Sequence, residues 1–228
     1  MNTSLHQPNP SPTKKLKASK PRITLLDGRE LQYHRPRERE QSAELLKLLP
    51  SSARNKKLEI EIGPGKGEFL ARRASKFPQR FFVGIDKLSK RVELTEKKLK
   101  RQSPEQNWLI LKKDARAFLQ KNLNPIEVFH VYQPDPWPKA RHHKHRFFRS
   151  PDARRWCEAL VNGGQLRFST DHKEYFAEIL DIVQSWQNFD LAFVCQKTAI
   201  HGEPSSHFEG IFLRQNLPVW KAVFVKKS

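Results

Sequence analysis

The chain has 228 residues, of which 37% are hydrophobic, and this is enough for one domain with an extension. Its 43 Lys and Arg residues against 24 Asp and Glu give a formal net charge of +19 at pH 7. Such an excess predicts a polyanionic partner, either a nucleic acid or an anionic membrane. The sequence contains no apolar run of transmembrane length and no apolar signal core, so we expect a cytoplasmic protein that does not span a membrane.

The first segment, residues 1–36, is predicted to be a basic, proline-rich, disordered extension. Residues 1–22 contain four prolines, five Lys or Arg and no acid, a composition that cannot bury enough apolar surface to offset the entropy of ordering. Residues 37–228 are predicted to form a single domain that begins with a short amphipathic helix over 37–49. Cys157 and Cys195 lack a CxxC spacing and are expected to be reduced core residues.

Strand-like apolar runs alternate with helical patterns after Pro50. Strands are expected at 58–62, 81–86, 107–112, 127–133, 165–169, 190–196 and 219–225, and helices near 68–77, 88–101, 115–121, 151–161 and 172–186. Ser150 and Pro151 favour a helix start, and Gly163-Gly164 favours its end before the fifth strand. This alternation predicts an α/β fold with a doubly wound, mostly parallel, seven-stranded sheet. Only a loop and a short segment near 207–216 precede the last strand, which is therefore expected to be antiparallel.

A glycine-rich turn follows the first expected strand. Residues 63–67 read Gly-Pro-Gly-Lys-Gly, and Glu68 stands where a dinucleotide fingerprint would have its third glycine. Glu61, at the end of the strand, would repel a pyrophosphate but suits a cationic ligand such as S-adenosylmethionine. The glycines alone are a weak indication of a cofactor site, and the acid before them strengthens it.

Two further acids follow the second and third strands. Asp86 lies where it could accept hydrogen bonds from ribose hydroxyls, and Asp114 where it could accept from an adenine amino group. Either acid alone is more often a helix cap or a solvated turn residue. Together with Glu61 they would line one crevice at the carboxyl ends of three successive strands.

The most unusual stretch is 134–148, which places Asp135 and Trp137 among three prolines and follows them with a run of Lys, Arg and His. The prolines require a stiff, extended loop at a strand end, where an acid and a ring could hold a nucleobase beside cations that hold phosphates. Trp137 could stack on a base or pack under the loop. His142, His143 and His145 lie too close in sequence to complete a tetrahedral set, so no metal is expected.

Residues 134–142, Pro-Asp-Pro-Trp-Pro-Lys-Ala-Arg-His, resemble the PDPWxKxRH signature of the tRNA (guanine-N7)-methyltransferases, and the resemblance extends from about residue 40 to 225. It implies a Rossmann-like S-adenosyl-L-methionine methyltransferase fold. It also implies methyl transfer to N7 of the variable-loop guanine at position 46 of tRNA, by a monomer or homodimer. Departures from the family pattern are Asn216 in place of a glycine and His145 in place of Lys or Arg.

The same resemblance implies residue roles. Asp135 is implied to be the catalytic acid. The cofactor-binding residues are implied to be Glu61, Gly63, Gly65, Asp86, Asp114 and Asp135. The tRNA-binding residues are implied to be Lys139, Arg141, Asp171 and the segment Ser206, His207, Phe208 and Glu209, which stands where the family has Thr-x-[Tyr/Phe]-Glu.

Guanine N7 carries a lone pair and no proton at neutral pH, so the chemistry needs alignment and electrostatics but no general base. The carboxylate of Asp135 could stabilise the growing positive charge, or it could accept from the guanine N1–H and amino group. Two rival functions are a methyltransferase acting on an exocyclic base amine, and a non-enzymatic nucleic-acid-binding module. The basic run 87–101 is either a solvated helix face or a surface that tracks phosphates.

Overall fold

The computed structural model describes residues 22–24, 30–32, 49–53, 55–115, 126–196 and 206–228. The helix expected over 37–49 and most of the one over 115–121 lie outside the described residues. Of the predicted extension 1–36, the described part is a small antiparallel sheet formed by β1 (Arg22–Thr24) and β2 (Glu30–Gln32). The division of the chain at residue 36 stays a prediction.

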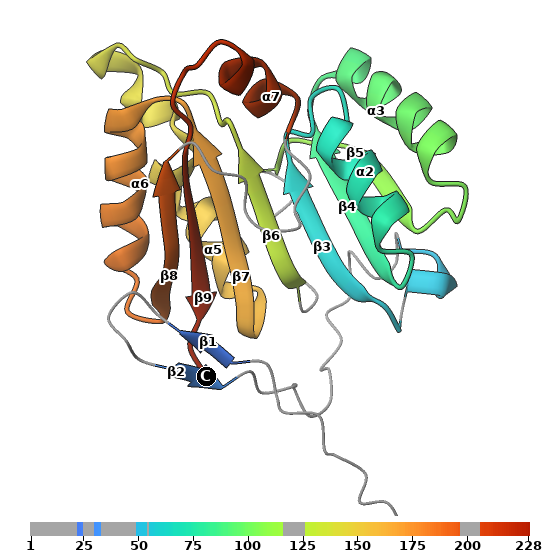
Figure 1. The fold of residues 1–228 in the computed structure, drawn as a ribbon, viewed down its shortest axis with the longest axis horizontal. Coiled ribbons are helices and arrows are strands. Elements are labelled where there is room, and N and C mark those ends of the chain that lie inside the picture. Colours follow the sequence, from blue (N-terminus) through green and yellow to red (C-terminus); the bar gives the residue numbers. More distant parts are fainter. Residues whose placement is uncertain (1–21, 25–29, 33–48, 54, 116–125, 197–205) are drawn as a thin grey trace, which may run out of the picture.

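The main sheet has seven strands in the order β5-β4-β3-β6-β7-β9-β8, as Figure 1 shows. These strands are β3 (Lys57–Ile62), β4 (Arg80–Asp86), β5 (Trp108–Lys112), β6 (Ile126–Tyr132), β7 (Leu160–Thr170), β8 (Phe189–Gln196) and β9 (Trp220–Lys226). β3 to β7 are paired in parallel, whereas β9 lies between β7 and β8 and is antiparallel to both. The prediction of a doubly wound, mostly parallel sheet with an antiparallel last strand is confirmed.

Helices cover both faces of the sheet (Figure 1). α2 (Glu68–Lys76) and α3 (Ser89–Gln102) lie over β3, β4 and β5, and α5 (Pro151–Glu158) and α6 (Lys173–Gln184) lie on the other face. α7 (His207–Arg214) lies above the carboxyl edge of the parallel strands. Three short 3-10 helices are η1 (Ser51–Ala53), η2 (Ala140–His145) and η3 (Phe147–Arg149). Within the described residues, no helix combines the length and apolar character that crossing a membrane requires.

Successive side chains of a strand point to opposite faces of the sheet, so the buried apolar side chains form a core on each face. Ile60, Phe129 and Phe168 point toward α5 and α6, where the ring of Trp156 stacks on Phe129 with a centroid distance of 5.1 Å. A smaller cluster on the other face packs α2 and α3 against β4, and it contains Leu70, Ala71, Ala74, Phe82 and Leu99. Large buried side chains on both faces fix the sheet, so its carboxyl edge is a rigid support for loops.

The boundary between α5 and β7 differs from the prediction. Ser150 caps α5 and Pro151 opens it as expected, but the helix ends at Glu158 and the strand begins at Leu160. The register shifts from Ile126 opposite Leu160 to Val128 opposite Gln165, so Gly163-Gly164 marks an irregularity inside the strand. Gly163 has φ of 77°, and a Cβ on Gly164 would lie 2.7 Å from the Val161 carbonyl oxygen. The two glycines therefore permit a β-bulge within β7, and they do not mark the end of α5.

Neither of the two cysteines forms a disulfide bond. Cys157 is fully buried on α5, as expected, but Cys195 is only half-buried because β8 is the edge strand of the sheet. The expectation that both are core residues is therefore correct for Cys157 and wrong for Cys195.

Candidate active site

A cleft of about 340 Å³ opens at the carboxyl ends of β3, β4, β5 and β6. Gly63, Asp86, Asp114 and Asp135 all line it, although they are up to 72 positions apart in the sequence. The other lining residues are Ile62, Ile85, Lys87, Arg91, Lys113, Ala115, Val131, Tyr132, Gln133, Pro134, Trp137, His145 and Phe147. The cleft thus brings together most of the residues for which the sequence predicts a cofactor role.

The glycine turn between β3 and α2 forms one wall. Gly63, Gly65 and Gly67 have φ of 68°, 60° and 72°, a left-handed conformation that glycine adopts without steric cost. A Cβ on Gly67 would lie 2.8 Å from Thr95 Cγ2, so only glycine lets α3 pack this closely on the turn. The Thr95 hydroxyl donates to the Gly65 carbonyl at 3.2 Å, which joins the turn to α3.

Asp86 lies at the end of β4 with its two carboxylate oxygens in different surroundings. Oδ1 accepts from the Leu88 backbone N–H at 2.9 Å, where α3 begins. Oδ2 is buried and accepts no hydrogen bond from the described residues; the nearest cation is Arg91, whose Nη1 is 3.9 Å away. A buried carboxylate oxygen that accepts no hydrogen bond from these residues, at the wall of a cleft, can accept a hydrogen bond from the hydroxyl groups of a ligand.

Glu61 is buried on β3, one residue before the cleft lining. Its Oε2 accepts no hydrogen bond from the described residues. Burial, and then the nearby charge of Asp86, raise the pKa of Glu61 to about 8, so its carboxyl is largely protonated at pH 7 in the protein alone. The sequence predicts an acid suited to a cationic ligand at this position, and the raised pKa means that a cation beside Glu61 would favour its ionisation.

The loop 134–138 forms the opposite wall. Asp135 is exposed at the cleft, and Trp137 has φ of 44° and leaves 36% of its surface exposed. The Trp137 ring lies 5.2 Å from the ring of His145 and 5.8 Å from that of His142. The indole is therefore held against imidazoles beside the cleft, where a base could stack on it, and it is not packed beneath the loop.

Two residues that the sequence reasoning did not single out hold this loop. The buried Arg146 donates from Nε to the Pro136 carbonyl at 2.7 Å, forms an ion pair with Glu178 of α6, and lies 4.7 Å above the Tyr175 ring. Gln133 has φ of 50° and donates its N–H to the Ser169 carbonyl at 2.8 Å. Arg146 occurs within a basic run and Gln133 at a strand end, so neither has a distinctive sequence signal.

Comparison with known proteins then decides the family. A family model, Methyltransf_4, described as "Putative methyltransferase", matches residues 55–222. The tRNA (guanine-N(7)-)-methyltransferase of Nitrosospira multiformis is 32% identical over 196 residues, which is 82% of this chain and 82% of that protein. This chain belongs to the tRNA (guanine-N7)-methyltransferase family. The resemblance carried by residues 134–142 is thereby confirmed.

Solved methyltransferase structures share the fold of this family member. The 30S ribosomal A1408 methyltransferase from an uncultured bacterium has a TM-score of 0.53 and 14% identity, covering 90% of this chain and 98% of that chain. The plantazolicin methyltransferase BpumL, solved in complex with SAH, has a TM-score of 0.51 and 12% identity, covering 75% of this chain and 76% of that one. At these identities the likeness concerns the fold.

The residues implied to bind tRNA occupy three places in this methyltransferase. Lys139 and Arg141 are exposed at the start of η2, and Arg141 donates from Nε to His142 Nε2 at 3.2 Å. Asp171 is exposed at the end of β7. None of these three residues lines the cleft. They lie exposed on the surface outside it.

The segment 206–209 divides into two kinds of residue. Ser206 accepts from the Glu209 N–H at 3.2 Å and so caps α7, while the Glu209 carboxylate forms a buried ion pair with Lys221 of β9. His207 is half-buried and Phe208 is 47% exposed. Ser206 and Glu209 thus stabilise α7 in the structure, and His207 and Phe208 are the side chains available to a substrate.

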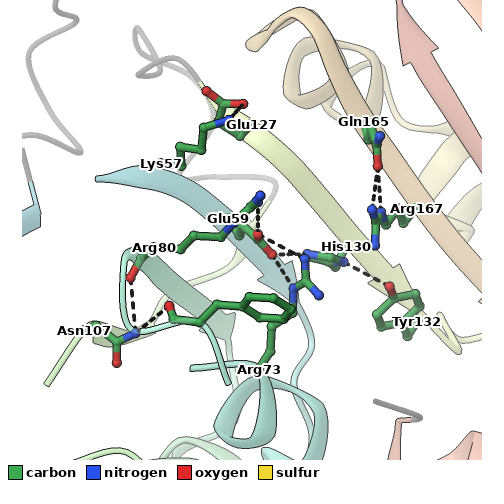
Figure 2. A network of polar contacts seen from close by, with 11 residues as sticks. Lys57, Glu59, Arg73, Arg80, Asn107, Glu127, His130, Tyr132, Gln165 and Arg167 are labelled. Atoms are coloured by element: carbon green, nitrogen blue, oxygen red, sulfur yellow. Dashed lines mark hydrogen bonds and ion pairs between the residues drawn. The ribbon is translucent and has the colours of Figure 1, made fainter. Parts of the chain in front are cut away.

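A buried polar network, drawn in Figure 2, joins β3, α2 and β6. Glu59 of β3 accepts from Arg73 Nε at 2.5 Å, also pairs with Arg80, and lies 2.9 Å from His130 Nε2. Because Glu59 only accepts, Nε2 of His130 carries the hydrogen and its Nδ1 accepts from the Tyr132 hydroxyl at 3.0 Å. Tyr132 lines the cleft, so this chain of contacts orients a cleft residue.

The charges in this network have a definite state at neutral pH. Burial lowers the pKa of His130 to about 4, more than the nearby Glu59 raises it, so the imidazole is neutral. Burial would raise the pKa of Glu59, but hydrogen bonds from His130 and Arg73 and the positive charge of Arg73 outweigh it and keep the pKa well below its usual range. Among the described residues, no three His, Cys, Asp or Glu side chains gather as a metal site requires.

Proposed function

We propose that this chain transfers the methyl group of S-adenosyl-L-methionine to N7 of the variable-loop guanine at position 46 of tRNA. The observation that carries the proposal is the single cleft that places Gly63, Asp86 and Asp114 on one side and Asp135 on the other. Family membership supports the reaction, because the relatives carry this activity in their names. The substrate implies a cytoplasmic enzyme that works on tRNA without a metal.

The residues of the cofactor wall fit the methyl donor. Asp86 Oδ2 is a buried acceptor that lacks a hydrogen bond from the described residues, as a residue that binds ribose hydroxyls would be. We assign Asp114, which lines the cleft, to the adenine amino group, and Gly63 and Gly65 leave the turn without side chains. When bound, the donor supplies an electrophilic methyl group on a sulfonium, and the carboxyl of Glu61 supplies the compensating negative charge.

Guanine N7 attacks without prior loss of a proton, so the protein contributes alignment and electrostatics. Asp135, on a loop stiffened by three prolines, is an exposed carboxylate at the cleft where the base would lie. It stabilises the positive charge that develops on the guanine ring, or it accepts from N1–H and the 2-amino group and thereby rejects adenine. Trp137 provides an exposed ring face beside the same position.

The test is methyl transfer from labelled S-adenosylmethionine to unmodified tRNA, followed by borohydride and aniline treatment, which cleaves at 7-methylguanosine. We expect cleavage at position 46, and a loss of about a hundredfold in rate, or about 3 kcal/mol, for Asp135→Ala. The free energy of unfolding of Asp135→Ala in urea is the control for intact folding. Label without cleavage would indicate another methylated atom, and no label would favour the nucleic-acid-binding module.

Inosine at the target position separates the two roles of Asp135. Inosine lacks the 2-amino group but keeps N7. If Asp135 binds the base edge, inosine slows the wild-type enzyme and has little further effect on Asp135→Ala. If Asp135 acts through the charge on the ring, the penalty for inosine is the same in both proteins.

A further inference from the structure

The outer face of α3 carries a line of exposed side chains that the cleft does not use. Lys90, Leu94, Lys97 and Arg101 are spaced by four, three and four residues, so they lie on one face of the helix. All four are exposed, and Leu94 leaves 42% of its surface in solvent. We call these four residues the α3 stripe.

The cations of the α3 stripe differ from the other cations of the helix. Within the described residues, Lys90, Lys97 and Arg101 form no ion pair and no hydrogen bond through their side chains. In contrast, Lys98 pairs with Glu68, and Lys100 pairs with Glu96 at 2.8 Å. The helix therefore pairs some of its cations locally, whereas these three form no ion pair within the described residues; the exposed Glu93 lies three residues after Lys90 and four before Lys97.

The stripe is continuous with the cleft. Lys87 and Arg91, at the start of α3, line the cleft, and Figure 1 shows the helix extending from there along the outer side of β4 and β5. From Lys90 to Arg101 the line is about 17 Å long at the helical rise of 1.5 Å per residue. A polyanion that enters the cleft with one residue can thus continue along the stripe with several of its charges.

We propose that the α3 stripe binds the sugar–phosphate backbone of the tRNA whose guanine occupies the cleft. This inference rests on the proposed function and adds the surface along which the substrate lies. Three cations in a line that form no ion pair with the described residues can each contact a phosphate of one strand. A membrane surface fits less well, because the exposed large apolar residues of α3 are only Leu88 and Leu94. Leu94, between the cations, can contact the sugars.

The first test removes the three charges with Lys90→Ala, Lys97→Ala and Arg101→Ala together. Alanine keeps an exposed helix stable, so the fold should be retained. We expect the slope of log Kd for tRNA against log salt to fall by about 2, since each phosphate contact contributes about 0.7 for a single strand. The KM for tRNA should rise about tenfold or more at moderate salt, while cofactor affinity and kcat at saturating tRNA stay unchanged.

A matched control removes the same charge elsewhere with Arg154→Ala, Arg155→Ala and Lys227→Ala. These side chains are ion-paired with Glu158, Asp152 and Asp190 at 2.9, 3.2 and 3.3 Å, and α5 lies on the face of the sheet opposite α3. The control should keep the wild-type salt slope. Equal losses in both triple variants would mean that only net charge matters, and an unchanged slope in the stripe variant would mean that tRNA lies elsewhere; either result overturns the proposal. If the wild type binds tRNA but does not methylate it, the proposed function fails, and the salt slope still tests the stripe.

Discussion

Gln133 and Asp171 are joined by a hydrogen bond in which the Asp171 backbone N–H donates to Gln133 Oε1 at 3.0 Å. The contact links the carboxyl end of β6 to that of β7. Gln133 immediately precedes the loop that carries Asp135, and its own N–H is bound to β7 through the Ser169 carbonyl. The loop with the proposed catalytic acid and the segment with a residue implied to bind tRNA are therefore held at a fixed separation.

Gln133→Met should lower kcat for tRNA five- to tenfold, because methionine keeps the length of the side chain but removes an acceptor whose hydrogen bond contributes about 1 kcal/mol. Cofactor affinity should stay at the wild-type value, since the cofactor wall is untouched. Gln133→Glu retains an acceptor for the Asp171 N–H and should recover most of the rate. Steady-state kinetics with calorimetric cofactor binding measures both; wild-type kcat in Gln133→Met would show that this link is dispensable.

Arg146→Met should destabilise the protein by about 3 kcal/mol, because it leaves the Pro136 carbonyl without its donor and removes a buried partner of Glu178. The matched control is Arg149→Met. Arg149 binds the other oxygen of Glu178 at 2.6 Å but is 46% exposed, so its loss should cost less than about 1 kcal/mol. Urea unfolding measures the difference, and similar losses for the two variants would contradict the assignment of Arg146 as the buried anchor.

Cofactor binding should release a proton from Glu61. With a pKa of about 8 in the protein alone, its carboxyl is mostly protonated at pH 7, and a cationic ligand favours the ionised form. Affinity for S-adenosylmethionine should therefore rise from pH 6 to pH 8 and level off above it. Calorimetry at pH 7 in phosphate and in Tris should give different binding heats for the wild type and more similar ones for Glu61→Gln. Equal heats in the wild type would exclude proton release.

The contribution of His130 to the stability of the fold should fall as the pH decreases from 7.5 to 5, whereas that of Glu61, whose pKa is raised on folding, should grow. His130 has a pKa of about 4 in the folded protein against about 6.5 when unfolded, so the unfolded chain binds the proton first. The contribution of the neutral imidazole to the free energy of unfolding is complete above pH 6.5 and is smaller by about 2 kcal/mol at pH 5. Glu59, whose pKa is also lowered on folding, extends the loss to more acid pH. Urea unfolding of the wild type and of His130→Gln isolates this contribution: the difference between their free energies of unfolding should change by about 2 kcal/mol between pH 7.5 and 5, and a constant difference would contradict this account.

Much of the fold follows from local patterns. Apolar runs of strand length, separated by helical patterns, predict a parallel sheet, because only buried strands require such runs. The boundary at Gly163-Gly164 was wrong because a glycine pair ends a helix or permits a bulge, and only the pairing with β6 distinguishes the two. Of the three acids predicted to line one crevice, Asp86 and Asp114 do so, since the carboxyl ends of parallel strands share an edge, whereas Glu61 lies one residue before the lining.

The supporting residues could not be predicted, because their roles depend on partners distant in sequence. Arg146 binds Glu178, 32 positions away, and Glu59 binds His130, 71 positions away. In the sequence, Arg146 is one cation among several and Glu59 is an acid in a strand. Ser206 and Glu209 are implied to bind substrate, whereas their contacts in the structure stabilise α7. Whether they also contact tRNA stays a prediction.

The position of β9 between β7 and β8 affects the order in which the protein can be made. During synthesis β8 emerges from the ribosome before the strand that joins it to the sheet, so it has no neighbour until residues 220–226 follow. Lys221 of β9 is also the buried ion-pair partner of Glu209 in α7. This ion pair cannot form until the same strand has been synthesised. A nascent chain interrupted before Trp220 would present two open strand edges, which are ready templates for aggregation and for recognition by chaperones. Translation of the last strand is therefore the step that completes both the sheet and the buried ion pair that holds α7.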